Sequence, residues 1–356
     1  MNNSKASKVT KSFVMSFAAI LVGLIVSVIF VAISSGNGLI ASASLLFGSI
    51  WRGSFGEKSQ LIETFVFATP LIFTGVAHAI AFKTGLFNIG VEGQFIIGML
   101  VASLVGIIPG IPSFLHILLI IATGALAGAI WAAIPGYLKA KVGTNEVVNT
   151  IMMNFIAMHL SNYFVYQKFK VEGTVATPII QENAQLTRFL GDQYRLNTGI
   201  FIAIALVILV FILLWKTTTG YELRAVGTSP HAAEYGGINI NKNIVLAMAI
   251  SGAVAGIGGA IHVAGVQHQA MQLFGFPGFG MDGIAVALVA KSHPIGVIFS
   301  AILFGALNLS SGTLMLFGIP KTISYLIQGV VILFIAAEYM FKWISEKKKK
   351  GATINE

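Results

Sequence analysis

The chain contains no cysteine and very little charge. Of its 356 residues, 10% are charged and 56% are hydrophobic. The missing cysteines exclude disulfides and cysteine-ligated metal or iron–sulfur centres. Soluble domains carry about 25% charged residues, so a content this low indicates an integral membrane protein.

Motifs for chemistry on this chain are also missing. There is no G-x-x-x-x-G-K-[ST] phosphate loop, so we do not expect the chain to hydrolyse ATP itself. Its seven histidines are scattered without metal-ligand spacing, and no Ser/His/Asp or Cys/His arrangement stands out. The net charge of +9 does not indicate nucleic-acid binding, because the lysines and arginines fall at the ends of apolar runs. The sequence predicts no catalytic residue, metal or cofactor.

Long apolar runs are what the chain does contain, and a membrane-spanning helix needs about 20 such residues. The first run, 12–33, precedes Ala41-Ser42-Ala43, which resembles a signal cleavage site. The run is longer than the 7–15 residues of a signal peptide, so we interpret it as an uncleaved span. The sequence predicts an all-α polytopic membrane protein with about ten spans, at 12–33, 61–82, 93–109, 114–137, 146–166, 197–215, 243–265, 279–291, 295–313 and 321–342.

The distribution of basic residues predicts the orientation, because basic residues concentrate in cytoplasmic loops. With the N-terminus inside, fifteen of the 22 basic residues are cytoplasmic, and seven are external: Arg52, Lys58, Lys168, Lys170, Arg188, Arg195 and Lys321. The prediction is a cytoplasmic tail 1–11, a transmembrane domain 12–342 and a basic cytoplasmic tail 343–356. Its two long loops are 167–196 outside and 216–242 inside.

The inner loop contains a predicted short helix. Ser229 followed by Pro230 is a typical helix start, and Gly236-Gly237 would end the helix. Ala232 and Ala233 would leave one face open to close approach by a partner, with the charge of Arg224 nearby. A solvated connector is the alternative interpretation.

Four segments of the chain resemble a known transporter family. They are RAVGTSPHAAEYGGINI (224–240), GLFNIGVEGQ (85–94), TNEVVNTIMMNFIA (144–157) and GFGMDGIAVALVAKSHPIG (278–296). Over roughly 60–340 the chain resembles the permease subunits of ABC importers in the branched-chain amino acid, simple-sugar and nucleoside branch. Nucleoside permeases served by a basic-membrane-protein lipoprotein are the most similar type. The chain departs from the pattern at Ala290-Lys291-Ser292, where glycine and a polar pair are expected.

The resemblance implies a set of partners. A cytoplasmic ATPase, which would bind ATP-Mg, would dock on the inner loop at Arg224, Gly227, Ala232, Ala233 and Gly237. An external substrate-binding lipoprotein would deliver a nucleoside, and a second permease chain, identical or paralogous, would complete the pore in the cell membrane of a bacterium. A sugar permease of the same family is one alternative. An ion-coupled secondary transporter using buried acids is another.

Two similar motifs open apolar segments in different halves of the chain. Gly90-Val91-Glu92-Gly93 begins the third span, and Gly280-Met281-Asp282-Gly283 begins the eighth, which is short and glycine-rich. If spans two to five and seven to ten are inverted halves, the motifs occupy equivalent places, and interrupted segments of this kind indicate a transport site. The alternative is plain helix packing with acids capping helix starts. The glycines expected to allow bends or close packing are Gly85, Gly90, Gly93, Gly280 and Gly283.

A set of amide side chains accompanies these motifs. Asparagine and glutamine offer donors and acceptors without charge, which suits a neutral polar solute such as a nucleoside. Hydrogen bonding between helices is the alternative, and the sequence does not separate the two. The predicted substrate pathway comprises Asn88, Glu92, Gln94, Asn145, Glu146, Asn149, Asn154 and Asp282.

Overall fold

A computed structural model describes residues 20–334 of the chain. Within that range the regular structure is helical, apart from one isolated antiparallel bridge between Ala176 and Met271. The chain divides into two compact units, residues 1–61 with 306–356 and residues 62–305. The predicted tails 1–11 and 343–356 and the first eight residues of the 12–33 run lie outside the described residues.

The unit formed by both ends of the chain is built from helices near its two termini. Helix Ile20–Ser35 and α2 (Leu39–Ser54) meet at a bend of 109° and together could form one broken span. Helix Thr322–Phe334 is the third apolar segment. Gly23 packs on the backbone of Val331, and the Ser54 hydroxyl donates to the Ala306 carbonyl at 2.7 Å. Helix α2 was not among the predicted spans.

The remaining predicted spans each overlap an observed helix, and they lie in the central unit except for 295–313, which crosses the boundary between the units. Five helices in the described range are long and apolar enough to cross a membrane, or six with the bent pair, while α4 and α11 are shorter. Two helices continue into π-helical turns, at Phe164–Lys168 after α6 and at Val263–Gln267 after α10. The helices are α3 (Lys58–Lys83), α4 (Val91–Gly106), α5 (Ser113–Val142), α6 (Glu146–Tyr163), α7 (Gly199–Lys216), α8 (Thr218–Thr228), α9 (Pro230–Tyr235), α10 (Ile240–His262), α11 (Phe279–Val289) and α12 (Pro294–Leu316).

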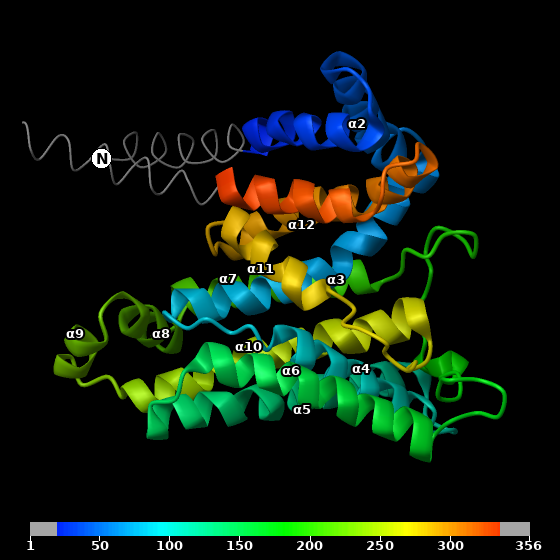
Figure 1. Cartoon of the computed structure of the whole chain (residues 1–356). Helices are drawn as coiled ribbons and strands as arrows, with labels where there is room; N and C mark the ends of the chain where they lie inside the picture. Colours follow the sequence, from blue (N-terminus) through cyan, green and yellow to red (C-terminus); the bar gives the residue numbers. More distant parts are fainter. Residues whose placement is uncertain (1–19, 335–356) are drawn as a thin grey trace, which may run out of the picture. The chain divides into compact units, whose positions relative to one another are not determined.

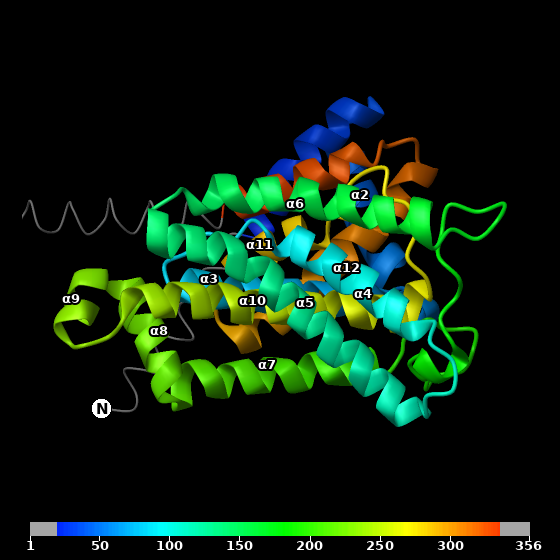
Figure 2. The same ribbon diagram turned by 90° about the horizontal axis from the view of Figure 1, so that it is seen from below.

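The core of the central unit is a crossing of α4, α5 and α10, visible in Figures 1 and 2. Glycines lie where the helices touch, at Gly128 against Gly252 and at Gly124 against Gly256. A Cβ atom on Gly252 would collide with the carbonyl oxygen of Gly128. Small residues allow helix backbones in membranes to approach closely, so this crossing is held by backbone contact.

The two predicted loops lie at opposite ends of the central unit (Figure 2). At one end, α8 and α9 join α7 to α10. At the other end, the chain between α6 and α7 forms an extended segment with one short 3₁₀ turn, Glu182–Ala184. This arrangement is what two loops on opposite sides of a membrane require.

Candidate functional site

The start of α4 is held by a buried network of amide side chains. Asn88 and Gln94 exchange two hydrogen bonds of 3.1 Å, and both side chains are buried. The Asn88 amide also donates to the hydroxyl of Ser251 on α10 at 3.0 Å, and that hydroxyl donates to the Ala77 carbonyl of α3 at 2.7 Å. The network therefore links three helices at the point where α4 begins.

Asn154 of α6 fixes α4 from the other side. Its Oδ1 accepts from the Gly93 N–H at 2.8 Å, and its Nδ2 donates to the Ile89 carbonyl at 2.9 Å. A Cβ atom on Gly93 would lie 2.9 Å from the Cα of Asn154. Gly93 is therefore needed for α4 and α6 to come this close.

Glu92 binds the backbone of a helix that is distant in sequence. Its carboxylate accepts from the N–H of Gly278 at 2.7 Å, of Gly280 at 2.5 Å and of Met281 at 3.1 Å. These groups belong to the start of α11, where helix N–H groups lack intrahelical partners and negative charge is favoured. Glu92 thus caps α11 rather than its own helix.

Gly280 makes this contact possible. A Cβ atom there would lie 2.7 Å from the Oε2 atom of Glu92 and 2.5 Å from its Cα. The two glycine–acid–glycine motifs identified in the sequence are therefore in direct contact.

An aromatic cluster lies beside the cap. Phe95 on α4, His262 at the end of α10 and Phe279 at the start of α11 have ring centroids 5.0–5.8 Å apart. Phe95 is fully buried, whereas the other two rings are partly exposed. The starts of α4 and α11 are therefore held together by these aromatic contacts as well as by the hydrogen bonds of Glu92.

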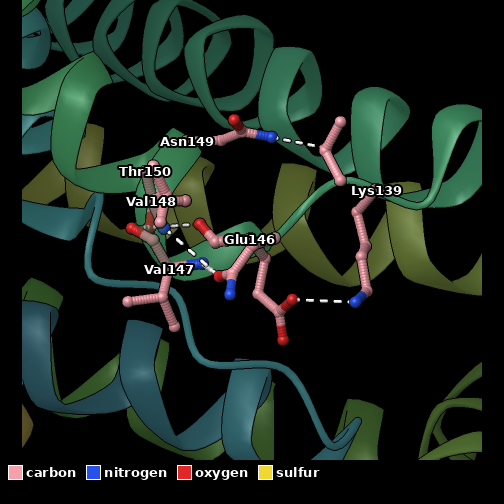
Figure 3. A network of polar contacts seen from close by, with 8 residues as sticks. Lys139, Glu146, Val147, Val148, Asn149 and Thr150 are labelled. Atoms are coloured by element: carbon pink, nitrogen blue, oxygen red, sulfur yellow. Dashed lines mark hydrogen bonds and ion pairs between the residues drawn. The ribbon is translucent and has the colours of Figure 1, made fainter.

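The predicted polar residues at the start of α6 make mostly local contacts, as Figure 3 shows. Asn145 is the N-cap, and its Oδ1 accepts from Val147 and Val148. Glu146 forms an ion pair of 2.9 Å with Lys139 of α5 (Figure 3). Asn149 donates to the Thr144 hydroxyl at 2.6 Å. These contacts define where α6 begins and how it meets α5.

The predicted pathway residues thus divide into three groups. Asn88, Glu92, Gln94 and Asn154 meet around the start of α4, whereas Asn145, Glu146 and Asn149 lie in the first turn of α6. Asp282 lies in the first turn of α11 and is partly exposed. Sequence reasoning missed Ser251, although an isolated hydroxyl within the apolar run of α10 was a usable signal.

The loop 216–242 folds into two short helices, α8 and α9, that enclose a groove. The predicted helix start is confirmed: the Ser229 hydroxyl accepts from Ala232 N–H, and Pro230 is the first residue of α9. Helix α9 ends at Gly236, and Gly237 adopts a φ of 80°. Ala232 is exposed and Ala233 is buried, and both line a groove of about 590 Å³ between α8 and α9.

Helix α8 rests directly on the connector between α3 and α4. A Cβ atom on Gly227 would lie 2.8 Å from the Cα of Thr84 and would collide with the carbonyl oxygen of Lys83. Gly85, with a φ of 74°, is the next residue of the connector and also lies against Gly227. Since the connector continues to Asn88 and Glu92, α8 is in backbone contact with the segment that carries the α4 network.

The segment between α6 and α7 packs on the chain that follows α10. The Thr177 N–H donates to the Ala270 carbonyl at 2.9 Å, and the Ile180 N–H donates to the His268 carbonyl at 2.9 Å. Arg188 lies 3.2 Å from Nε2 of His268. Burial, with a smaller effect of Arg188, lowers the pKa of His268 below its usual value, so the neutral ring accepts this hydrogen bond.

Asn162 anchors the next part of the same chain. Its side chain donates to the Leu273 carbonyl at 2.8 Å and accepts from the Leu273 N–H at 2.7 Å. Together with the Glu92 contact at Gly278, this fixes the chain on both sides of the exposed Phe274. Asn162 was not among the predicted site residues.

Comparison with known proteins identifies the family. Residues 60–336 match the family described as the permease component of branched-chain amino acid transport systems. The chain is 39% identical to the guanosine ABC transporter permease protein NupP of Bacillus subtilis, over 94% of this chain and 96% of that protein. It is 34% identical to the nucleoside ABC transporter permease protein NupB of Lactococcus lactis, over 90% of this chain and 93% of the relative.

A more distant relative is the glucose ABC transporter permease protein TsgB13 of Haloferax volcanii, 28% identical over 83% of this chain and 81% of that protein. No solved structure matches the chain. The family match covers most of the chain, and the observed helices are those of a multi-pass membrane protein. The chain therefore belongs to the permease-component family of branched-chain amino acid transport systems, and it is a transport subunit of an ABC transporter rather than an enzyme.

Proposed function

We propose that the chain forms the translocation pathway of a bacterial ABC importer for nucleosides. The observation that carries the proposal is the similarity to a guanosine permease and a nucleoside permease over at least 90% of the chain. The uncharged amides of Asn88, Gln94 and Asn154 around the start of α4 support it, since such groups suit a neutral polar solute. In this proposal the pathway passes along the starts of α4, α6 and α11, and includes the acids Glu92, Glu146 and Asp282.

The proposal includes the partners of an importer. ATPase subunits that bind ATP-Mg would dock on α8 and α9, where the groove contains Arg224, Ala232 and Ala233. A lipoprotein would deliver the solute on the opposite side, and a second permease chain would complete the pore. Ten spans in two inverted halves remain part of the proposal, supported by the contact between the starts of α4 and α11.

The uptake of radiolabelled guanosine tests the substrate. In cells that lack their own nucleoside importers and express the chain with its partner subunits, we expect ATP-dependent uptake that excess unlabelled nucleosides suppress and excess glucose does not. A sugar importer is the second candidate, because the chain is also similar to a glucose permease. Suppression by glucose alone would establish that candidate instead.

The proposed orientation places both termini and the α8–α9 loop in the cytoplasm. It is supported by the asymmetry of basic residues and by the opposite positions of the two loops in Figure 2. Because the chain has no cysteine, single cysteines can be introduced at Ser229 and at Gln181 without background. In intact cells a membrane-impermeant thiol reagent should label Gln181→Cys, and should label Ser229→Cys only after permeabilisation. External labelling of Ser229→Cys in intact cells would contradict the orientation.

A further inference from the structure

Two cationic side chains, Lys83 of α3 and Arg224 of α8, lie where these helices touch, since Gly227 of α8 packs on the Lys83 carbonyl. Lys83 is half-buried, donates to the Lys291 carbonyl at 3.4 Å and interacts electrostatically with Arg224 of α8. Neither Lys83 nor Arg224 belongs to the ion pairs Lys139–Glu146 and Arg195–Glu63 found within residues 20–334. Two neighbouring cations in a partly buried place repel each other, and an anion between them would remove that cost.

The acid of α8 does not compensate them. Glu222 accepts a hydrogen bond of 3.1 Å from Asn243 of α10, so its carboxylate is directed to a different helix. His293, in the turn between α11 and α12, also lies near Lys83. Burial and Lys83 lower the pKa of His293 below its usual value, so this ring is neutral and adds no charge to those of Lys83 and Arg224.

An aromatic platform borders the two cations. The guanidinium of Arg224 lies 5.7 Å from the ring centroid of Trp215, at the end of α7. Trp215 in turn stacks on Phe211 at 5.3 Å and contacts His293 at 5.1 Å. Tryptophan is enriched where a membrane helix reaches the headgroup region, so Trp215 indicates the depth of the site.

Helix α7 carries the apolar surface that acyl chains would cover. Its side chains Phe201, Ile208 and Leu209 are 57%, 51% and 62% exposed, along the helix that leads to Trp215. Basic pockets between membrane helices at the cytoplasmic side bind anionic headgroups. We propose that Lys83 and Arg224, beside Trp215, bind the phosphate of an anionic phospholipid whose acyl chains lie along α7.

Quenching of Trp215 fluorescence by brominated lipids tests the site. The chain has four tryptophans, so replacing Trp51, Trp131 and Trp343 with phenylalanine leaves Trp215 as the only reporter. The full chain is placed in phosphatidylcholine bilayers with equal amounts of brominated phosphatidylglycerol or brominated phosphatidylcholine. Each basic residue near anionic lipid contributes roughly fivefold in local enrichment, so we expect clearly stronger quenching by phosphatidylglycerol.

Variants of Lys83 and Arg224 distinguish lipid binding at this site from a general attraction of anionic lipid to the basic surface of the protein. Lys83→Gln combined with Arg224→Gln should make quenching by the two lipids equal, whereas Lys83→Arg should keep the preference and show that the fold tolerates changes there. Lys242→Gln, which removes an exposed charge at the start of α10, is the matched control and should also keep the preference.

One result would overturn the proposal, and a second would identify the anion that the cations serve instead. Equal quenching of Trp215 by the two lipids before any cation is changed would mean that no anionic lipid is selected. If, in addition, the double variant lowered the recovery of ATPase subunits with the chain, the anion that the cations serve would be a carboxylate of a cytoplasmic partner. Neither result depends on the identity of the transported solute.

Discussion

Replacing Glu92 with glutamine should lower nucleoside uptake by about tenfold or more at equal membrane abundance, with the partner subunits present. The carboxylate accepts from three N–H groups of α11, and glutamine offers one oxygen and a donor amide in its place. Leaving buried N–H groups without acceptors costs about 1–3 kcal/mol each, and 1.4 kcal/mol corresponds to a factor of ten in an equilibrium. We therefore expect α11 to leave its position on α4 in a large fraction of molecules.

Hydrogen exchange provides the structural readout for the same variant. The amide protons of Gly280 and Met281 should exchange faster in Glu92→Gln, while those in the middle of α5 should not change. Glu57→Gln is the matched control, because Glu57 is exposed and accepts only from Ser59. Reduced uptake with unchanged exchange at the start of α11 would mean that Glu92 acts on the solute and not through α11.

The second large effect is expected from a single methyl group on α8. Gly227→Ala should abolish most ATP-driven uptake, because the added Cβ collides with the Lys83 carbonyl and separates α8 from the connector. If α8 transmits the movement of the ATPase, hydrolysis by the complex should continue but no longer respond to the delivered solute. The measurements are uptake and solute-stimulated ATP hydrolysis in proteoliposomes.

Gly236→Ala is the control for this experiment. Gly236 lies in the same loop, but a Cβ atom there would be 3.3 Å from its nearest neighbour, the carbonyl oxygen of Ala233, a contact that a small shift relieves. This variant should transport nearly normally. Equal losses in the two variants would show that the loop as a whole, and not the contact at Gly227, is sensitive to added bulk.

Hydrophobic runs and helix-start residues predicted much of the fold. The run 114–137 lies within α5, and Ser229-Pro230 predicted α9 to the residue, because a cap and a proline act locally. Helix α2 was missed because Ser42, Ser44 and Ser49 interrupt its apolar character. Local signals identify a helix where its apolar run is continuous or its cap is distinctive, and they miss one whose run is interrupted by serines.

The sequence predicted which residues belong to the candidate site, but it did not predict which groups they contact. The sequence indicated Glu92 and Gly280 and paired their motifs, but it did not predict the hydrogen bonds between them. The partners of Glu92 are backbone N–H groups about 186 residues away, and any residue type supplies such groups. The same holds for Asn154, whose partners are the N–H of Gly93 and the carbonyl of Ile89.

The glycine contacts between α5 and α10 restrict how transporters of this kind can change their cargo. Where Gly128 meets Gly252, no side chain lies between the helices, and any replacement would force them apart. Almost no substitution is therefore tolerated at these glycines. We expect new solute preferences to arise outside this crossing, at positions such as Asn154 of α6 whose side chains reach α4, while the crossing is inherited unchanged.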